Sequence, residues 1–427
     1  MLYREAIEFL CGLQMFGTNL ELENVRRLAE RAGSPHRQLR FIHVAGTNGK
    51  GSTCAMIDSI YRAAGWQVGL YTSPHLVSFR ERIQVNRGLI SENDVIQLVT
   101  EAKDWLADFP RDNHPTFFEI VTVMALRHFA RQRCDIVVWE TGLGGRLDAT
   151  NIVTPLASVI TNIQFDHEQW LGDSLEKIAV EKAGIIKPGV PVVTAAEAPE
   201  ALQVIRATAA RLNAPFHSID ERAANIRYSG SNLRGPHQRR NAALAVRTAE
   251  VVRGAMPFND SAVERGLNNV PWPGRFQVIE RGRQFLILDG AQNPAGARAL
   301  AATLRSEVRQ QPLTVVLGVL ADKNWQTVCQ TLAPLASRIV LAPVNSPRTA
   351  PAADLAAACR AVNPRLPVQC AASLDEALDL TRRDELVVVT GSLYLIGEAM
   401  DLLGLGHAAH ERALNEWTAP RQNERRP

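Results

Sequence analysis

The sequence predicts an α/β protein with two domains, each built on a mainly parallel β-sheet. Its 427 residues are enough for two to three domains of about 150 residues each. Hydrophobic residues make up 46% of the chain and charged residues 21%, which is typical of a globular protein and excludes disordered and fibrous classes. Strand-sized apolar runs alternate with helical stretches twice along the chain, as expected for parallel sheets covered by helices on both faces.

The first half begins with helices and continues with alternating strands and helices. Residues 1–37 are predicted to be helical, with an amphipathic run over residues 21–31 that ends at Gly33. A strand at 41–45 leads into a glycine-rich loop, and a helix is expected over residues 53–64. Further strands are predicted at 68–71, 135–139, 157–160 and 190–193.

The same alternation begins again near residue 285. Strands are predicted at 285–288, 313–317, 339–341 and 386–390. Helices are expected to begin near Pro294, Asn324, Ala352, Leu374 and Leu393. The segment 271–275 is rich in Pro and Gly and is the predicted linker, so the expected domains are residues 1–272 and 273–427. The tail from about residue 405 is expected to be partly disordered.

Charge and cysteine content exclude several classes of protein. The net charge is only +3, and no basic run before the tail is longer than Arg239-Arg240, so a dedicated nucleic-acid binder is not expected. The six cysteines are scattered without a C-x-x-C pair, which is typical of reduced thiols in a cytosol. The longest uncharged stretch, 149–165, contains Pro155, so we expect no membrane span; with no signal-peptide pattern at the N-terminus, we expect a cytoplasmic protein.

Lysine is scarce in this chain. Only six of the 47 basic residues are lysine, and the others are arginine. Because the positive surface is built almost entirely from arginine, each lysine is a candidate for specific chemistry. The lysines are Lys50, Lys103, Lys177, Lys182, Lys187 and Lys323.

The glycine-rich loop at 46–52 lies between a predicted strand and a predicted helix. Glycines let backbone N–H groups converge on phosphate oxygens, and the helix N-terminus adds a favourable dipole. Lys50 would meet the β- and γ-phosphates of a nucleotide, and Ser52 or Thr53 would lie near a phosphate or its Mg²⁺. The loop departs from the standard phosphate-loop pattern, because Val44 stands where the first Gly belongs and Gly51 follows the lysine. The alternative is a glycine-rich turn with an exposed lysine.

Two further polar positions follow predicted strands. Glu140 ends the apolar run at 135–139, and ligands of parallel sheets collect at the carboxyl ends of strands. A carboxylate there suits Mg²⁺ beside nucleotide phosphates, although it could instead cap a loop. Asp166 and His167 follow the next strand, and a lone histidine is more often a structural hydrogen-bonding residue than a ligand.

Short motifs in sequence order identify a family. They are VAGTNGKGS at 44–52, YTSPH at 71–75, ETGLGGRLDATN at 140–151, DH at 166–167, EKAGI at 181–185, HQRRNA at 237–242, PGRFQ at 273–277, DGAQNP at 289–294 and GSLY at 391–394. Together they resemble folylpolyglutamate synthase/dihydrofolate synthase, a branch of the Mur-ligase-like ATP-dependent amide ligases, over nearly the whole chain. The resemblance implies an N-terminal P-loop ATPase domain and a C-terminal Rossmann-like domain.

The resemblance also implies roles for individual residues. Mg²⁺ would be held by Ser73, Glu140 and His167, and Lys182 would bridge to a second metal as a carbamate; without the resemblance, Lys182 reads as an ordinary ion-pair partner. The implied ATP-binding residues are Gly46, Thr47, Asn48, Gly49, Lys50, Gly51, Ser52, Asn241, Arg275 and Asp289. The implied catalytic residues are Lys50, His167, Lys182, Arg275 and Asp289. The implied pterin and folate residues are Asn19, Leu20, Glu21, Thr116, Phe117, Phe118, Glu119, Asp148 and Ala149.

Residue type bears on the aromatic pair of the pterin site and on one position in the second domain. Phe117 and Phe118 could stack on a planar ring, yet aromatic pairs are as often part of a core. Gln292 stands where the family usually has His, and glutamine can hydrogen-bond but cannot titrate. A general-base role at position 292 is therefore not expected.

The activity implied is ATP-dependent formation of an amide through an acyl phosphate. L-glutamate would be joined to dihydropteroate, forming dihydrofolate, and to the terminal glutamate of reduced folates. The implied cofactors are ATP and two Mg²⁺ ions, with a monovalent cation such as K⁺ as a further candidate. All partners would be small molecules, with no nucleic acid and no membrane, and the protein would be a monomer.

Three other functions remain open at this point. One is a folylpolyglutamate synthase that lacks the dihydropteroate activity. Another is a cell-wall Mur ligase, which the 45 residues before Gly46 disfavour because those enzymes usually carry a whole domain there. The third, from another class, is a nucleotide-binding regulatory protein that ligates nothing and leaves the second domain unexplained.

Overall fold

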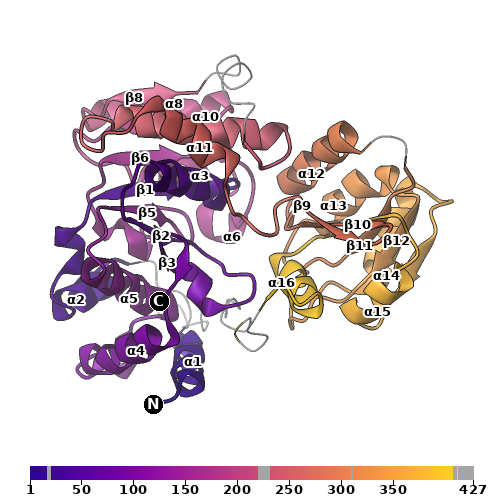
Figure 1. Cartoon of the computed structure of the whole chain (residues 1–427), viewed down its shortest axis with the longest axis horizontal. Helices are drawn as coiled ribbons and strands as arrows, with labels where there is room; N and C mark the ends of the chain where they lie inside the picture. The colour runs from indigo at the N-terminus through magenta and orange to yellow at the C-terminus, as the bar shows by residue number, and fades with distance from the viewer. Residues whose placement is uncertain (17–20, 220–230, 309–310, 407–410, 412–427) are drawn as a thin grey trace, which may run out of the picture.

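Two α/β units make up the protein, each organised around its own sheet (Figure 1). The computed structural model describes residues 1–16, 21–219, 231–308, 311–406 and 411. Most of the tail expected to be disordered therefore lies outside the described residues. Among the described helices, none has the length and apolar character needed to cross a membrane.

The first unit contains an eight-stranded sheet in which all neighbours are parallel except at the β3 and β4 edge. In spatial order the strands are β4 (Gly88–Leu89), β3 (Ile83–Val85), β2 (Val68–Tyr71), β5 (Ile136–Glu140), β1 (Phe41–Ala45), β6 (Ala157–Ile160), β7 (Val192–Thr194) and β8 (Phe216–Ser218). The predicted mainly parallel sheet is confirmed. β3, β4 and β8 were not predicted, because two or three residues form no recognisable apolar run.

Helices cover both faces of this sheet (Figure 1). They are α1 (Tyr3–Gly12), α2 (Glu23–Arg31), α3 (Lys50–Ala63), α4 (Glu92–Leu106), α5 (Phe117–Arg131), α6 (Glu168–Leu171), α7 (Leu175–Ala183), α8 (Pro199–Arg211), α10 (Pro236–Val251) and α11 (Asp260–Asn268). One core lies between the sheet and α1, α2, α4 and α5. Another lies between the sheet and α3, α10 and α11, so the central strands are buried on both sides.

The second unit is a six-stranded sheet with helices on both faces. Its order is β13 (Val368–Cys370), β12 (Arg338–Leu341), β11 (Thr314–Leu317), β14 (Leu386–Thr390), β10 (Gln284–Asp289) and β9 (Gln277–Arg281), with only β9 antiparallel. Its helices are α12 (Pro294–Glu307), α13 (Trp325–Leu332), α14 (Ala352–Val362), α15 (Leu374–Leu380) and α16 (Leu393–Leu402). The predicted two-domain α/β fold is confirmed, and a boundary between residues 272 and 273 remains our proposal.

Two predicted boundaries, the starts of α3 and of β7, were wrong. α3 begins at Lys50 rather than Thr53, because the end of the loop already forms the first turn, with the Thr53 N–H donating to the Gly49 carbonyl at 2.9 Å. Helical segments are confirmed in the described part of residues 1–37, where the amphipathic run at 21–31 corresponds to α2 and the left-handed backbone of Ser34 (φ 52°) follows it. β7 begins at Val192 rather than residue 190, because Pro191 has no N–H for the ladder.

Candidate functional site

The phosphate loop connects β1 to α3 at the carboxyl edge of the first sheet. Gly46 has φ +148°, and a Cβ there would lie 1.8 Å from the Thr161 Oγ1. Gly49 has φ +82°, and a Cβ there would lie 2.6 Å from the Asn241 Oδ1. Glycine is required at both positions, since the backbone conformation and the close neighbours exclude any side chain. The contact also brings Asn241, predicted from sequence as an ATP residue, against the loop.

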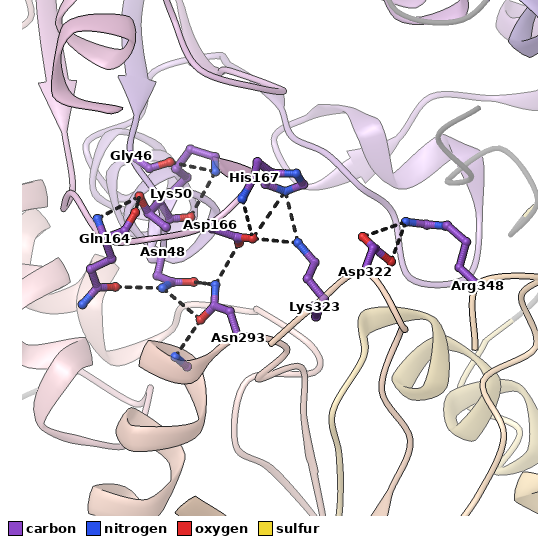
Figure 2. A network of polar contacts seen from close by, with 12 residues as sticks. Gly46, Asn48, Lys50, Gln164, Asp166, His167, Asn293, Asp322, Lys323 and Arg348 are labelled. Atoms are coloured by element: carbon purple, nitrogen blue, oxygen red, sulfur yellow. Dashed lines mark hydrogen bonds and ion pairs between the residues drawn. The ribbon is translucent and has the colours of Figure 1, made fainter. Parts of the chain in front are cut away.

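Two lysines converge on the carbonyl of Gly46. The Lys50 Nζ donates to it at 3.0 Å (Figure 2), and the Lys182 Nζ donates to it at 2.9 Å from α7. Lys182 is buried, and that burial, with the nearby Lys50 charge, lowers its pKa to about 7. The loop is therefore a locally positive site suited to a polyanion.

Glu140 lies at the end of β5 and is buried. Its Oε2 accepts the Ser73 N–H at 3.1 Å, so two of the three predicted metal ligands are neighbours. Burial raises the pKa of Glu140 to about 7 although the Lys50 charge acts in the opposite direction. A cation beside this carboxylate would favour its ionised form.

His167, the third predicted metal ligand, contacts the second unit. Its backbone is left-handed (φ +53°) at the N-cap of α6, and its Nε2 lies 3.3 Å from the Lys323 Nζ. Burial, followed by the Lys323 charge, lowers its pKa to about 4. Among the residues that the structure describes, no group of three or more His, Cys, Asp or Glu side chains is arranged for a metal ion.

Arg275 and Asp289 come from the start of the second unit. The Asp289 carboxylate accepts the Phe276 N–H at 2.9 Å and the Ala291 N–H at 3.0 Å, which fixes the turn that carries Arg275. Burial raises the pKa of Asp289, and the Arg275 charge opposes that rise. These predicted ATP residues are therefore held together. Gln292, two residues beyond Gly290, is half-buried.

A cavity of about 370 Å³ connects the two units. Its lining includes Gly51 and Ser73, with Glu140 from β5 and Trp272 and Arg275 from the linker segment. Residues predicted separately as loop, metal and nucleotide residues thus face one partly open cavity. A cavity of this volume is within the range of small-molecule sites.

The predicted pterin residues lie at the start of α5. Thr116 and Glu119 form a capping box, in which the Glu119 Oε2 accepts the Thr116 N–H at 2.8 Å. Phe117 and Phe118 both pack against the hydrophobic core. A Cβ added at Gly142 would lie only 2.5 Å from the Phe118 ring. The aromatic pair is therefore at least partly core.

The remaining predicted pterin residues lie in two different segments, the loop after β5 and the N-terminal region. The Asp148 carboxylate accepts the Leu143 N–H at 2.8 Å and the Thr150 N–H at 3.0 Å, so it holds the loop after β5. Ala149 is buried beside it. Glu21 is exposed but close enough to raise the pKa of Glu119. Asn19 and Leu20 lie outside the described residues.

Sequence reasoning missed the residues that join the two units at this site. The Lys323 Nζ donates to the Asp166 Oδ1 at 2.8 Å, and the Asn293 Nδ2 donates to the Asp166 Oδ2 at 2.9 Å (Figure 2). Asn293 also pairs with Asn48 of the phosphate loop, with its Nδ2 3.1 Å from the Asn48 Oδ1. Lysine scarcity was the available signal for Lys323, and the Asn-Pro sequence typical of a helix start was the signal for Asn293.

Comparison with known proteins places both units. Residues 44–251 match the Mur ligase middle domain, and residues 274–393 match the Mur ligase glutamate ligase domain. The dihydrofolate synthase/folylpolyglutamate synthase of Bacillus subtilis is 38% identical over 93% of this chain and 98% of that protein.

Solved structures are similar over the same extent. The crystal structure of folylpolyglutamate synthase from Thermotoga maritima has a TM-score of 0.83 at 34% identity and covers 96% of this chain and 98% of that one. E. coli FolC in complex with DHPP and ADP has a TM-score of 0.84 at 28% identity and covers 95% and 98%. The chain therefore belongs to the dihydrofolate synthase/folylpolyglutamate synthase family of Mur ligases, which are ATP-dependent ligases.

Proposed function

We propose that this protein joins L-glutamate to dihydropteroate, forming dihydrofolate, and to the terminal glutamate of reduced folates. The observation that carries the proposal is one cavity lined by Gly51 at the end of the phosphate loop, by Glu140 and by Arg275. The relatives named dihydrofolate synthase/folylpolyglutamate synthase support both activities, and E. coli FolC was solved with DHPP and ADP together.

The proposed reaction proceeds in two steps. The γ-phosphoryl group of ATP moves to the substrate carboxylate, giving an acyl phosphate and ADP. The amine of L-glutamate then attacks the acyl carbon; the C–N bond forms, phosphate leaves, and the amine loses a proton. Lys50 and Arg275 would neutralise phosphate charge during the first step, where positioning and electrostatics dominate catalysis. Asn241 and Asp289 would contact the nucleotide from either side of the linker.

The donor set at Glu140 fits Mg²⁺. Hydroxyl and carboxylate oxygens are preferred ligands of this ion. Burial raises the pKa of Glu140 to about 7, so a bound cation would stabilise its ionised form. Ser73 and Glu140 would hold it, with His167 as the expected third ligand. When bound, Mg²⁺ supplies charge neutralisation for the phosphates. A monovalent cation such as K⁺ stays within the proposal, and turnover after replacing K⁺ with choline tests it.

Lys182 is suited to carbamate formation. A lysine amine attacks CO₂ only when neutral, and burial with a pKa of about 7 leaves much of Lys182 neutral near physiological pH. The neutral amine forms the N–C bond to CO₂ and releases one proton, which leaves an anionic carbamate whose oxygens could ligate a second Mg²⁺. The same environment argues against Lys182 as an ordinary ion-pair partner, because its Nζ donates a hydrogen bond to the Gly46 carbonyl.

We propose that the pterin end of the substrate lies near the start of α5 and the loop after β5. The adjacency of Phe118 and Gly142 brings these two segments together. The net charge of only +3 argues against non-specific binding to nucleic acid or to an anionic membrane, and we propose that the protein is a cytoplasmic monomer. Light scattering coupled to size-exclusion chromatography tests the monomer.

An omission experiment tests the function. Purified protein receives ATP, Mg²⁺, dihydropteroate and L-glutamate, and ADP release is measured with each component left out in turn. Release that requires all four supports the ligase, and a parallel assay with tetrahydrofolate in place of dihydropteroate tests the second activity.

Each contrary outcome selects another function. Glutamate-dependent turnover with tetrahydrofolate but none with dihydropteroate would identify a folylpolyglutamate synthase alone. ADP release independent of both co-substrates, or nucleotide binding without any release, would identify a protein that ligates nothing.

A further inference from the structure

Polar side chains from the second unit reach the phosphate-loop edge of the first unit. Lys323 lies in the loop between β11 and α13, and Asn293 is the N-cap of α12. Both contact the same carboxylate, Asp166, at 2.8 Å and 2.9 Å (Figure 2). One carboxylate of the first unit thus receives donors from two separate segments of the second.

The pair of Asp166 and Lys323 is almost removed from solvent. The two side chains are 10% and 8% exposed. Both carboxylate oxygens of Asp166 accept a hydrogen bond across the units, Oδ1 from the Lys323 Nζ and Oδ2 from the Asn293 Nδ2. A pair buried in this way is sensitive to geometry, since removing one partner leaves a desolvated charge without compensation.

The arrangement extends to the phosphate loop itself. Asn293 pairs with Asn48 through two amide contacts, at 3.1 Å and 3.3 Å, and its Oδ1 also accepts the Gly296 N–H at 2.8 Å. The helix start that positions Asn293 is therefore tied to a loop residue that is expected to bind phosphate. By contrast, the ion pair of Arg234 and Glu307 between the same units is 3.6 Å long with side chains 53% and 35% exposed.

We propose that Lys323 is a positioning residue that, with Asn293, holds the second unit closed over the phosphate loop through Asp166. The inference rests on the proposed function for its catalytic consequence, because closure brings Arg275 and Asp289 to the nucleotide. Surface pairs such as Arg234 with Glu307 contribute little to such a preference, whereas a desolvated pair with a second donor selects one arrangement. The closed state thus depends on Asp166 and Lys323 before any substrate binds.

The first test compares the wild-type chain with Lys323→Met without ligands. Small-angle X-ray scattering should give a larger radius of gyration for Lys323→Met, while circular dichroism shows an unchanged secondary structure. In the omission assay the variant should lose about 10- to 100-fold in kcat/KM, the range of a typical coupling free energy between sites. Lys323→Arg keeps the charge and should recover both the radius and most of the activity.

A double-mutant cycle tests whether Lys323 acts through its pair with Asp166 or through a contact with substrate. Asp166→Asn alone should also increase the radius of gyration. The double variant, Asp166→Asn with Lys323→Met, should lose no more kcat/KM than the worse single variant. Asp322→Asn is the matched control, because Asp322 precedes Lys323 but pairs with Arg348 inside the second unit at 3.3 Å. It should leave the radius and the kinetics unchanged.

Two results would overturn the proposal. One is an unchanged radius for Lys323→Met without ligands, which would make Lys323 a substrate contact or a bystander. The other is additive losses in the cycle, which would mean that the two residues act separately. The scattering result does not depend on the ligase assignment. Wild-type protein that releases no glutamate-dependent ADP would refute the proposed function, while the radius of gyration of Lys323→Met without ligands would still test whether Lys323 holds the two units together.

Discussion

Three of the six lysines meet at one place. Lys50, Lys182 and Lys323 all act on His167, and together they oppose its protonation. Lys50 and Lys182 share the Gly46 carbonyl, while Lys323 reaches the group from the second unit. The scarcity of lysine therefore pointed to the site, and tertiary contacts were needed to show which lysines belong to it.

Lys182→Ala should lose at least about 100-fold in kcat and still fold. The substitution removes the amine required for a carbamate, and catalytic groups that build a metal site typically contribute on this scale. Stability should hardly fall, because a buried cation with a pKa lowered to about 7 is itself poorly stabilised. ADP release and thermal unfolding measure the two effects.

The matched control is Lys177→Ala on the same helix. Lys177 is exposed and pairs with Asp173 at the surface, so its loss should change neither quantity. Near-normal turnover of Lys182→Ala would contradict the carbamate role.

At the scale of elements, the start of α5 shows one sequence pattern with two meanings. Thr116-x-x-Glu119 before an apolar run is a capping-box pattern, and the structure gives it that role. Glu119 is nevertheless unusual, because it is buried and its Oε1 has no hydrogen-bond partner. The capping box therefore uses only one carboxylate oxygen of Glu119, and the other is available for a ligand. The role of Glu119 in binding the pterin end of the substrate remains our proposal.

Glu119→Gln should stabilise the protein at high pH but not at low pH. Burial raises the pKa of Glu119 from 4.5 to about 7, so the folded protein keeps this proton longer than the unfolded chain. Wild-type stability should therefore fall as pH rises from about 4.5 to 7, by up to about 3 kcal/mol. The variant should lack that decline, and urea unfolding at pH 5 and pH 8 measures the difference.

Glu5→Gln is the control for this pH effect. Glu5 accepts the Leu2 N–H in the first turn of α1, as Glu119 does in α5, but that bond is exposed. We expect no comparable gain at pH 8. A constant difference between Glu119→Gln and wild type across the pH range would refute the burial of a titrating carboxyl.

At the scale of the whole molecule, the linker is a packed contact. Trp272 lies against Gly51 of α3, where an added Cβ would be 2.6 Å from the ring, and the Arg87 guanidinium lies 5.4 Å from the ring centroid. Arg87 also donates to the Pro271 carbonyl. The connection between the two sheets is therefore held by the β3–β4 hairpin and the phosphate loop.

Trp272→Ala should lower the free energy of unfolding by about 2 kcal/mol. The loss is smaller than for a fully buried tryptophan because Trp272 is half-buried. Urea denaturation measures it. Trp272→Phe keeps a ring over Gly51, so its loss of unfolding free energy should be less than half of the loss in Trp272→Ala. Equal losses for both variants would contradict ring packing as the cause.

The α/β class, the central strands and the phosphate loop could be predicted from local patterns in the sequence. Apolar runs such as 135–139 have the length and composition of buried strands, and glycines at 46 and 49 meet local backbone demands. Such features depend on neighbours along the chain, so a pattern reports them. The loop's helix start at Lys50 was placed three residues late because its first turn contains no periodic apolar residue.

The contacts between residues far apart in the sequence became visible only in the folded structure. Asp166 and Lys323 are 157 positions apart and belong to different sheets, and no local pattern pairs them. The same holds for the two lysines at Gly46 and for the altered pKa values of Glu140 and Lys182, which arise from burial. Burial and long-range pairing depend on the packing of complete units against each other, and a linear pattern carries neither.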